Sequence, residues 1–237
     1  LDVPSAKEPE SIFRFIRRSI ERTDAFNAVF LVPTGIGAEI GGHAGDATPA
    51  ARVLAEVCDR LITHPNVVNA RVEGDRIDRM VWATGAYAVT FNGLGEPDEK
   101  FQPKGYVTDY YTDEAVKVIE NNRNRPFFLY LAHWGIHNPL QATREDYDAL
   151  SHITDHRQRV YSSMIRAVDR SVARVTLALE ENGLAENTLI IFTSDNGGAG
   201  YIGLPNVNKP YRGWKLNHFE GGTHVPFMAR WPAQINA

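Results

Sequence analysis

The segment TLIIFTSDNGG, residues Thr188 to Gly198, gives the clearest indication of the fold. It is an apolar run that stops abruptly in Ser194, Asp195, Asn196 and two glycines. A short, continuous apolar run bounded by turn residues is typical of a strand buried on both faces of a sheet. Asp, Asn and Gly are also ordinary turn residues, so this segment alone favours a simple turn over a functional site.

Similar apolar runs occur elsewhere and alternate with helical patterns, which predicts an α/β fold with a mostly parallel sheet and helices on both faces. The other predicted strands are Ala28–Pro33, Pro126–Ala132 and Val225–Trp231. Four helices are predicted: Ser11–Thr23, a helix capped by Thr48, a helix that Thr112 or Asp113 caps and that runs through Asn122, and Arg157–Asn182. Gly183 is expected to end the last of these in a left-handed conformation. Residues 70 to 105 show no sustained period and are predicted to be mostly loop.

The carboxyl ends of parallel strands are where such sheets bind ligands, so polar residues that follow the predicted strands are the candidates for a site. Asp195 and Asn196 offer two hard oxygen donors, which suits Ca²⁺ or Mg²⁺ better than zinc. His133 and His137 are four residues apart, but Gly135 lies between them and a proline follows, so they are not predicted as a helical zinc pair. Either histidine could donate to an anion or protonate a leaving group.

A third candidate segment, YRGWKLNHFEGGTHVPFMARWP, contains Arg212 and Lys215 ahead of a Gly-Gly turn. A lysine ammonium can neutralise an oxygen of a sulfate or phosphate group, whereas the default interpretation is a surface lysine. The sequence by itself leaves these interpretations open.

Composition narrows the function classes. The 237 residues carry a formal charge of −4 and are 43% hydrophobic, which indicates a globular chain and argues against nucleic acid as a partner. Cys58 is the only cysteine, so no disulfide within the chain and no cysteine-based zinc site is expected. We expect neither a signal peptide at the charged N-terminal stretch nor a membrane-crossing segment.

Four segments in order resemble the sulfatase family, particularly its arylsulfatase-like members, over about residues 76 to 232. They are GYVTDYYTDEAVKVIE, RPFFLYLAHWGIHNPLQA, YSSMIRAVDRSVARVTLALEENGLAENTLIIFTSDNGG and YRGWKLNHFEGGTHVPFMARWP. The resemblance implies a partial alkaline-phosphatase-like α/β fold and hydrolysis of sulfate esters with a divalent cation, usually calcium.

Carried over by motif, the resemblance implies that Asp195 and Asn196 bind the metal. It also implies that His137, in IHNPLQ, and Lys215, in RGWK, contact the sulfate or the leaving oxygen. Attack on sulfur spreads negative charge over the sulfuryl oxygens, so a cation and a protonated histidine are chemically appropriate there. His133 has no equally firm role.

The family's nucleophile is a formylglycine made from a Cys or Ser in C/S-x-P-S-R, and no such motif is present. Cys58 lies within VCDR, and DVPSA near the N-terminus has Asp where the nucleophile belongs. The family's early Asp-Asp metal pair and its G-K-W-H segment are also absent. Residues 1 to 70 instead resemble a conserved bacterial and plant family of unknown function. We therefore predict two segments, 1–70 of unknown function and 71–237 as a partial sulfatase catalytic domain.

These features together predict a sulfatase-family hydrolase that is weakly active or inactive as given. Its partner would be a small-molecule or carbohydrate sulfate ester, with no nucleic acid and no membrane involved. The alternatives are a phosphatase or phosphodiesterase of the same superfamily, and a non-catalytic remnant. Family members are often exported, but neither the compartment nor the oligomeric state follows from the sequence.

Overall fold

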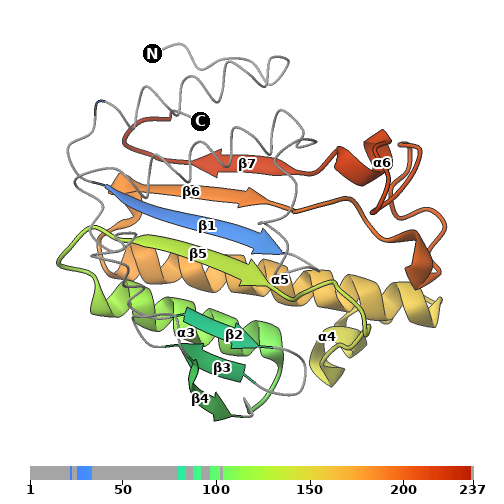
Figure 1. Ribbon diagram of the computed structural model, residues 1–237, viewed down its shortest axis with the longest axis horizontal. Coiled ribbons are helices and arrows are strands. Elements are labelled where there is room, and N and C mark those ends of the chain that lie inside the picture. The colour runs from blue at the N-terminus through green and yellow to red at the C-terminus, as the bar shows by residue number, and fades with distance from the viewer. Residues whose placement is uncertain are drawn as a thin grey trace.

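The protein is described by a computed structural model. The structure describes residues 22, 26–33, 80–83, 88–91, 97–101 and 104–235. Figure 1 shows a central four-stranded sheet with two long helices packed along it and a second, smaller sheet beside them.

The central sheet has the strand order β5-β1-β6-β7. Its strands are β1 (Asn27–Pro33), β5 (Phe128–His133), β6 (Thr188–Thr193) and β7 (Phe227–Arg230). β1 pairs in parallel with β5 and β6, whereas β7 is an antiparallel edge strand on β6. In Figure 1 the three parallel arrows point toward the end of the molecule that carries α6 (Glu220–Thr223). The predicted mostly parallel α/β sheet is confirmed.

β1 is the centre of the sheet, although it comes from the predicted N-terminal segment 1–70. Asn27 fixes its start, because its Oδ1 accepts from the backbone N–H of Phe127 at 3.3 Å and its Nδ2 donates to Thr188 Oγ1 at 3.4 Å. The strands that flank β1 both come from the segment 71–237, so the two predicted segments share one sheet. The boundary near residue 70 stays a prediction.

Both faces of β1 are buried from Ala28 to Leu31, which explains why this part of the strand is continuously apolar rather than alternating. Ala28 and Phe30 pack on one face with Phe26, Leu189, Ile191 and Trp231. Val29 and Leu31 pack on the other face, where α3 (Val107–Asn121) and α5 (His156–Glu181) contribute Ala115, Ile119, Val175, Ala178 and Leu179. These two clusters form the core that fixes the strand ends.

α5 agrees with its prediction to within one residue at each end. Its apolar positions recur at steps of three and four, so one stripe faces the sheet and α3. Asp155 caps the helix by accepting from the backbone N–H of Gln158 at 2.7 Å. Gly183 follows the helix with φ of 68°, the left-handed conformation that its position predicted.

α3 begins at Val107, five or six residues before its predicted start. The extra turn contains Val, Thr and Tyr, which have modest intrinsic helix propensity. It forms because Thr108 and Thr112 are buried against α5, where Thr112 Oγ1 donates to the carbonyl of Thr108 at 2.7 Å and lies within hydrogen-bond distance of Ser171 Oγ, at 2.6 Å. Tertiary packing therefore overrides local propensity.

The prediction that residues 70 to 105 are mostly loop is wrong for the described part of that segment. A three-stranded antiparallel sheet of order β2-β3-β4 occupies it, with strands Met80–Ala83, Ala88–Phe91 and Pro97–Phe101. The strands are only four or five residues long, and the β3–β4 pairing shifts register between Thr90 and Phe91. Strands this short show no sustained alternation for sequence reasoning to detect.

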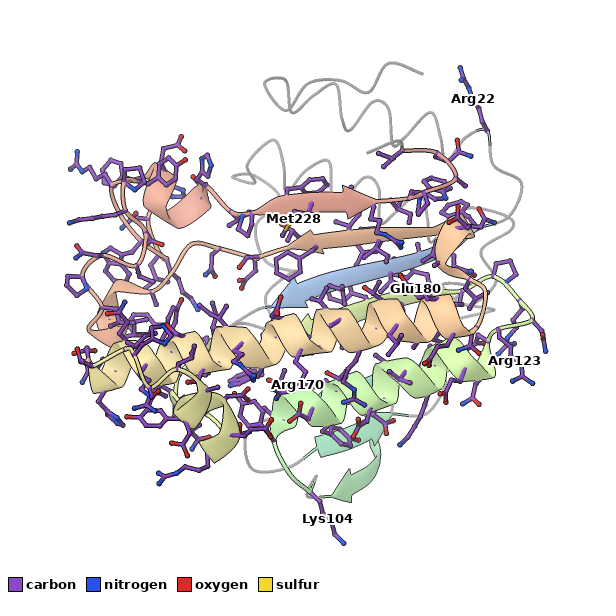
Figure 2. The ribbon with its side chains drawn as sticks, turned by 180° about the vertical axis from the view of Figure 1, so that it is seen from behind. Arg22, Lys104, Arg123, Arg170, Glu180 and Met228 are labelled. Atoms are coloured by element: carbon purple, nitrogen blue, oxygen red, sulfur yellow. The ribbon has the colours of Figure 1, made fainter. Side chains whose placement is uncertain are left out.

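α4 (Arg144–Ala149) was not predicted. Thr143 caps it, and the fully buried carboxylate of Asp146 accepts hydrogen bonds from Arg166 and Arg170 of α5, each at 2.6 Å to Oδ1. Arg170 also reaches Asp109 of α3 at 3.1 Å. Figure 2 shows Arg170 where α5 faces α3 and α4, so one guanidinium ties the three helices together.

Three features predicted near the N-terminus lie outside the described residues: the helix Ser11–Thr23 apart from Arg22, the helix capped by Thr48, and the surroundings of Cys58.

Candidate functional site

The loop after β6 presents Asp195 and Asn196 at the carboxyl edge of the sheet. Ser194 Oγ donates to the Asn196 carbonyl at 3.1 Å, and Asn196 Nδ2 donates to the Gly197 carbonyl at 2.8 Å. The second of these bonds fixes the side-chain amide of Asn196 through its nitrogen. Its Oδ1 is therefore the atom that can accept a donor or coordinate a cation.

The loop after β5 separates the two candidate histidines. His137 Nδ1 lies 2.7 Å from the carbonyl oxygen of Asn138. Because a carbonyl can only accept, this contact assigns the proton to Nδ1 and makes Nε2 the ring nitrogen available to a ligand. Ile136, directly before His137, has φ of 69°, a left-handed conformation that a β-branched residue rarely adopts. The loop is therefore held in a strained conformation next to His137.

His133 is the last residue of β5, and its ring lies on the helix side of the sheet, against Ser171 of α5 and Tyr111 of α3. It is 1% exposed, and its Nε2 is 2.8 Å from Ser171 Oγ of α5. Its Nδ1 is buried and has no hydrogen-bond partner within the described ranges. Burial lowers the pKa of His133 to about 4, so the ring is neutral at pH 7. His133 is a core residue, and the two histidines do not form a pair.

Lys215 is 5% exposed, so the default interpretation of a surface lysine is wrong. Its backbone N–H donates to the Gly198 carbonyl at 3.2 Å, which joins the Lys215 loop to the Asp195 loop. Leu216, the next residue, has φ of 82°. As at Ile136, a strained non-glycine residue adjoins a candidate site residue.

The two loops fit together through their glycines. Gly197 N–H donates to the Gly222 carbonyl at 3.0 Å, and Gly221 N–H donates to the Arg212 carbonyl at 2.7 Å. A Cβ on Gly197 would overlap with the Gly221 carbonyl, and a Cβ on Gly221 would overlap with the Gly213 carbonyl. The D-N-G-G and E-G-G motifs therefore need glycine so that their backbones can approach each other.

Asn208 holds the same loops by a side-chain clamp that sequence reasoning missed. Its Oδ1 accepts from the Gly198 N–H at 2.7 Å, and its Nδ2 donates to the carbonyls of Gly198 and Gly213 at 2.8 and 3.2 Å. Asn208 lies in LPNVNKPYR, a segment without a recognisable motif. Its only advance signal is the concentration of Asn and Pro in that segment, which indicates a loop but not a clamp.

The four candidate residues meet in one small pocket. Asp195, Asn196, His137 and Lys215 line a cavity of about 40 Å³ at the carboxyl edge of the sheet. The other described residues that line it are Ile136, Asn138, Tyr161, Ser194, Gly197, Gly198, Ala199, Tyr201 and Ile202. Three segments that are far apart in the sequence therefore converge on one cavity, although their roles stay predictions.

The charges in this pocket are not neutralised by direct pairing. Burial raises the pKa of Asp195, and the positive charge of Lys215 and the nearby His137 only partly offset that effect. Among the residues described, Lys215 forms no ion pair at 4.0 Å or closer. A buried ammonium and a partly desolvated carboxylate that face a cavity without pairing are typical of a ligand site.

The donor set fits a hard divalent cation only in part. Asp195 and Asn196 provide oxygen ligands of the type that calcium prefers, but calcium takes about six to eight of them. No group of three or more His, Cys, Asp or Glu side chains that could hold a metal occurs in the described ranges. The described residues do not by themselves form a calcium cage.

The fold and the pocket define a class of protein, an α/β domain with a polar pocket that contains a buried lysine at the carboxyl edge of a mostly parallel sheet. A model of the Sulfatase family matches residues 55–237. The chain therefore belongs to the sulfatase family. The match includes β5, β6 and β7 and all four candidate site residues.

Individual relatives agree with this assignment. The chain is 34% identical over 140 residues to the uncharacterized sulfatase YdeN of Escherichia coli (strain K12), covering 58% of this chain and 25% of that protein. It is 38% identical over 136 residues to the N-acetylgalactosamine-6-sulfatase of Mus musculus, covering 55% of this chain and 25% of that enzyme. The matched region thus spans about a quarter of these relatives' length.

Solved structures agree as well. The structure of Ps i-CgsB in complex with k-i-k-neocarrahexaose is 25% identical with a TM-score of 0.56, covering 93% of this chain and 47% of that one. The PsFucS1 sulfatase from Pseudoalteromonas sp. is 28% identical with a TM-score of 0.51, covering 63% of this chain and 30% of that one. The expected partial sulfatase fold is confirmed. No helix in the described part of the chain is long and apolar enough to span a membrane.

Proposed function

We propose that this chain carries the anion-binding half of a sulfuric ester hydrolase site, with Lys215 and His137 binding the sulfuryl group of a sulfate ester. The observation that supports this most is the buried Lys215, which faces the same cavity as His137, Asp195 and Asn196 and forms no ion pair with any described residue. An ammonium held in this way offers its charge to an incoming anion rather than to a protein carboxylate.

In this proposal His137 acts on the departing oxygen. The Nδ1–H is held by the Asn138 carbonyl, so a protonated ring would present its second N–H at Nε2. Transfer of that proton to the alkoxide, as the S–O bond to it breaks and a water oxygen bonds to sulfur, would leave a neutral alcohol, a neutral imidazole and hydrogen sulfate, with one proton of the water released to solvent. Lys215 would stabilise the charge on the sulfuryl oxygens at the same time.

Asp195 and Asn196 are proposed to contribute two ligands to a divalent cation, Ca²⁺ or Mg²⁺, which would add further positive charge beside the sulfuryl group. Two ligands cannot give tight binding, so we expect calorimetry to detect Ca²⁺ only at a Kd of about 1 mM or weaker. Tight binding would show that ligands beyond these two complete the site.

The non-catalytic alternative is favoured by two observations. The sequence contains no formylglycine motif, and the described residues provide only two of the cation's ligands. We therefore propose that the chain as given binds sulfate but hydrolyses sulfate esters weakly or not at all. Turnover of an aryl sulfate at an ordinary enzymatic rate of about 10 s⁻¹ would contradict this and require a nucleophile that the motifs do not reveal.

Titration with inorganic sulfate tests the proposal directly. Lys215→Ala should weaken sulfate binding by about tenfold or more, because a hydrogen bond to a charged group contributes roughly 1.5–3 kcal/mol. Lys117→Ala is the matched control, since Lys117 is an exposed lysine on α3 that pairs with Glu114 at 2.9 Å. Equal affinity in the wild-type chain and both variants would rule out Lys215 as the sulfate ligand.

An aryl phosphate tested in parallel separates the phosphatase alternative, which predicts turnover of the phosphate ester rather than the sulfate ester.

A further inference from the structure

A second cavity adjoins the candidate site and has no assigned role. It has a volume of about 380 Å³, within the range of small-molecule pockets, which starts at roughly 300 Å³. The described residues that line it are Asn138, Leu140, His156, Arg157, Val160, Tyr201 and Ile202. Asn138, Tyr201 and Ile202 also line the small pocket of Lys215, so the two cavities share a wall.

Arg157 gives this cavity a fixed positive charge. Its Nη1 donates to the Ile202 carbonyl at 3.0 Å, which positions the guanidinium. Gly203 lies directly against it, because a Cβ at that glycine would overlap with Arg157 Nη1. Among the residues described, Arg157 has no carboxylate partner, and no Asp or Glu lines the cavity. The remaining N–H groups of the guanidinium are therefore available to an external anion.

The other walls suit a polar ring with one apolar face. Tyr201 is 49% exposed, and its ring packs edge-on against Trp214 at 6.0 Å between centroids, which keeps it in place as a flat surface. Leu140 and Val160 add apolar surface. His156 holds Nδ1 at 2.8 Å from the Tyr147 hydroxyl, so its Nε2 stays available as a second polar contact.

We propose that this cavity is a subsite for a neighbouring sugar unit of the sulfate ester, and that Arg157 binds a second anionic group, a sulfate or a carboxylate, on that unit. The inference rests on the proposed function and specifies its substrate class as polyanionic saccharides rather than simple aryl sulfates. Lys215 would bind the sulfuryl group in the small pocket. Arg157 would bind the second anion in the larger cavity, on the other side of the wall that the two cavities share.

The test measures affinity rather than turnover. Four probes are titrated into the full chain: inorganic sulfate, an aryl sulfate, and a chondroitin disaccharide with one sulfate and with two. The disulfated disaccharide should bind about tenfold or more tightly than the aryl sulfate, as expected for one additional hydrogen-bonded charge. The monosulfated disaccharide, which carries a carboxylate, shows whether the carboxylate or the second sulfate provides the gain.

Variants then show whether Arg157 provides this gain in affinity. Arg157→Gln should lower the affinity ratio of disulfated disaccharide to aryl sulfate about tenfold. Arg157→Lys, which keeps the charge but loses the planar fork, should recover part of it. Gly203→Ala keeps the arginine but displaces its guanidinium, so it should also lower the ratio. Arg174→Gln, an α5 arginine paired with Asp113, is the matched control and should leave the ratio unchanged.

The outcomes separate the two proposals. If the wild-type chain binds aryl sulfate and inorganic sulfate but gains nothing from the disaccharides, the subsite is wrong while the proposed function stands. If Arg157→Gln lowers the affinity for every probe equally, Arg157 supports the loop and is not an anion ligand, which also overturns the subsite. If no sulfate binds even to the wild-type chain, both proposals fail together.

Discussion

Two carboxylates face basic side chains in different parts of the protein, Asp146 between α4 and α5 and Asp195 at the carboxyl edge of the sheet. Asp146 is fully buried and accepts hydrogen bonds from Arg166, Arg170 and Thr143. Asp195 has Lys215 nearby, but the two form no direct ion pair. Among the residues that the structure describes, Asp146 is therefore fully paired, whereas Asp195 forms no ion pair.

The pKa values of the two groups reflect this difference. Burial acts to raise the pKa of Asp146, but the hydrogen bonds from Arg170, Thr143 and Arg166 outweigh it, and the net direction is downward. For Asp195 burial again raises the pKa. The charges of Lys215 and His137 lower it, but not enough to reverse the effect of burial. A carboxylate that stabilises the fold and one that is available to a ligand can thus be distinguished by whether their partners touch them.

The largest expected effect comes from removing the paired carboxylate. Asp146→Ala leaves Arg166 and Arg170 without their partner, and breaking such a buried pair costs roughly 3–5 kcal/mol of unfolding free energy. We expect the lower end of that range, because the two arginine side chains are 41% and 30% exposed and water can solvate them. Urea denaturation measures the change.

The pH dependence of the same variant gives a second readout. Because the folded-state pKa of Asp146 is lowered, its stabilising contribution is present above the unfolded pKa of about 3.9 and is lost as pH falls through the lower folded value. The cost of Asp146→Ala should therefore shrink in strong acid. Asp148→Asn is the control, since Asp148 lies on the same helix but is 59% exposed, and it should change stability by less than about 1 kcal/mol. Equal costs for the two variants would contradict the comparison.

His133 isolates the contribution of burial, because burial alone accounts for its lowered pKa. The folded-state pKa is about 4 against an ordinary value of 6.5, so the unfolded chain binds more protons between these values and stability rises with pH across that window. The rise corresponds to roughly 3 kcal/mol, at 1.36 kcal/mol for each pKa unit. Urea midpoints measured from pH 4 to pH 7 should show the rise in the wild-type chain, and His133→Gln should remove most of it. A slope that persists in the variant would assign it to other groups.

Asn208 tests whether the two loops of the candidate site depend on each other. Asn208→Ala removes three hydrogen bonds to the backbone of Gly198 and Gly213, which should cost about 1–3 kcal/mol. It should also weaken inorganic sulfate binding, because Lys215 lies in one of the clamped loops and Asp195 borders the other. Asn206→Ala, an exposed neighbour in the same segment, is the control for both measurements. Unchanged sulfate affinity in Asn208→Ala would show that the clamp does not position the pocket.

Much of the central fold could be predicted from local patterns. β5, β6 and α5 follow from continuous apolar runs and from helical spacing, and Asp195 and His137 lie after strand ends where an α/β sheet binds ligands. Lys215 needed the family resemblance, because nothing local distinguishes a buried lysine from a surface one.

The rest depends on contacts that sequence patterns do not encode. The partners of Asp146 are 20 and 24 residues away on another helix, and Asn208 binds backbone atoms 10 and 5 residues away. Such bonds involve residue types that are equally common on surfaces and in turns. The early start of α3 and the strands β2–β4 were missed for a related reason, since tertiary pairing rather than periodicity stabilises them.

The smallest effect is also the one with the least intuitive sign. Because the folded-state pKa of Asp195 is raised, ionising this group at neutral pH disfavours the fold, and its stabilising contribution is complete only below the unfolded pKa. Asp195→Asn, measured with a chelator present, should therefore raise the thermal midpoint slightly at pH 7 and leave it unchanged near pH 3, while weakening Ca²⁺ binding. Asp169→Asn, at an exposed position on α5, should show no such pH-dependent gain. A lower midpoint for Asp195→Asn at pH 7 would mean that Asp195 is paired as Asp146 is, and would remove the distinction between the two carboxylates.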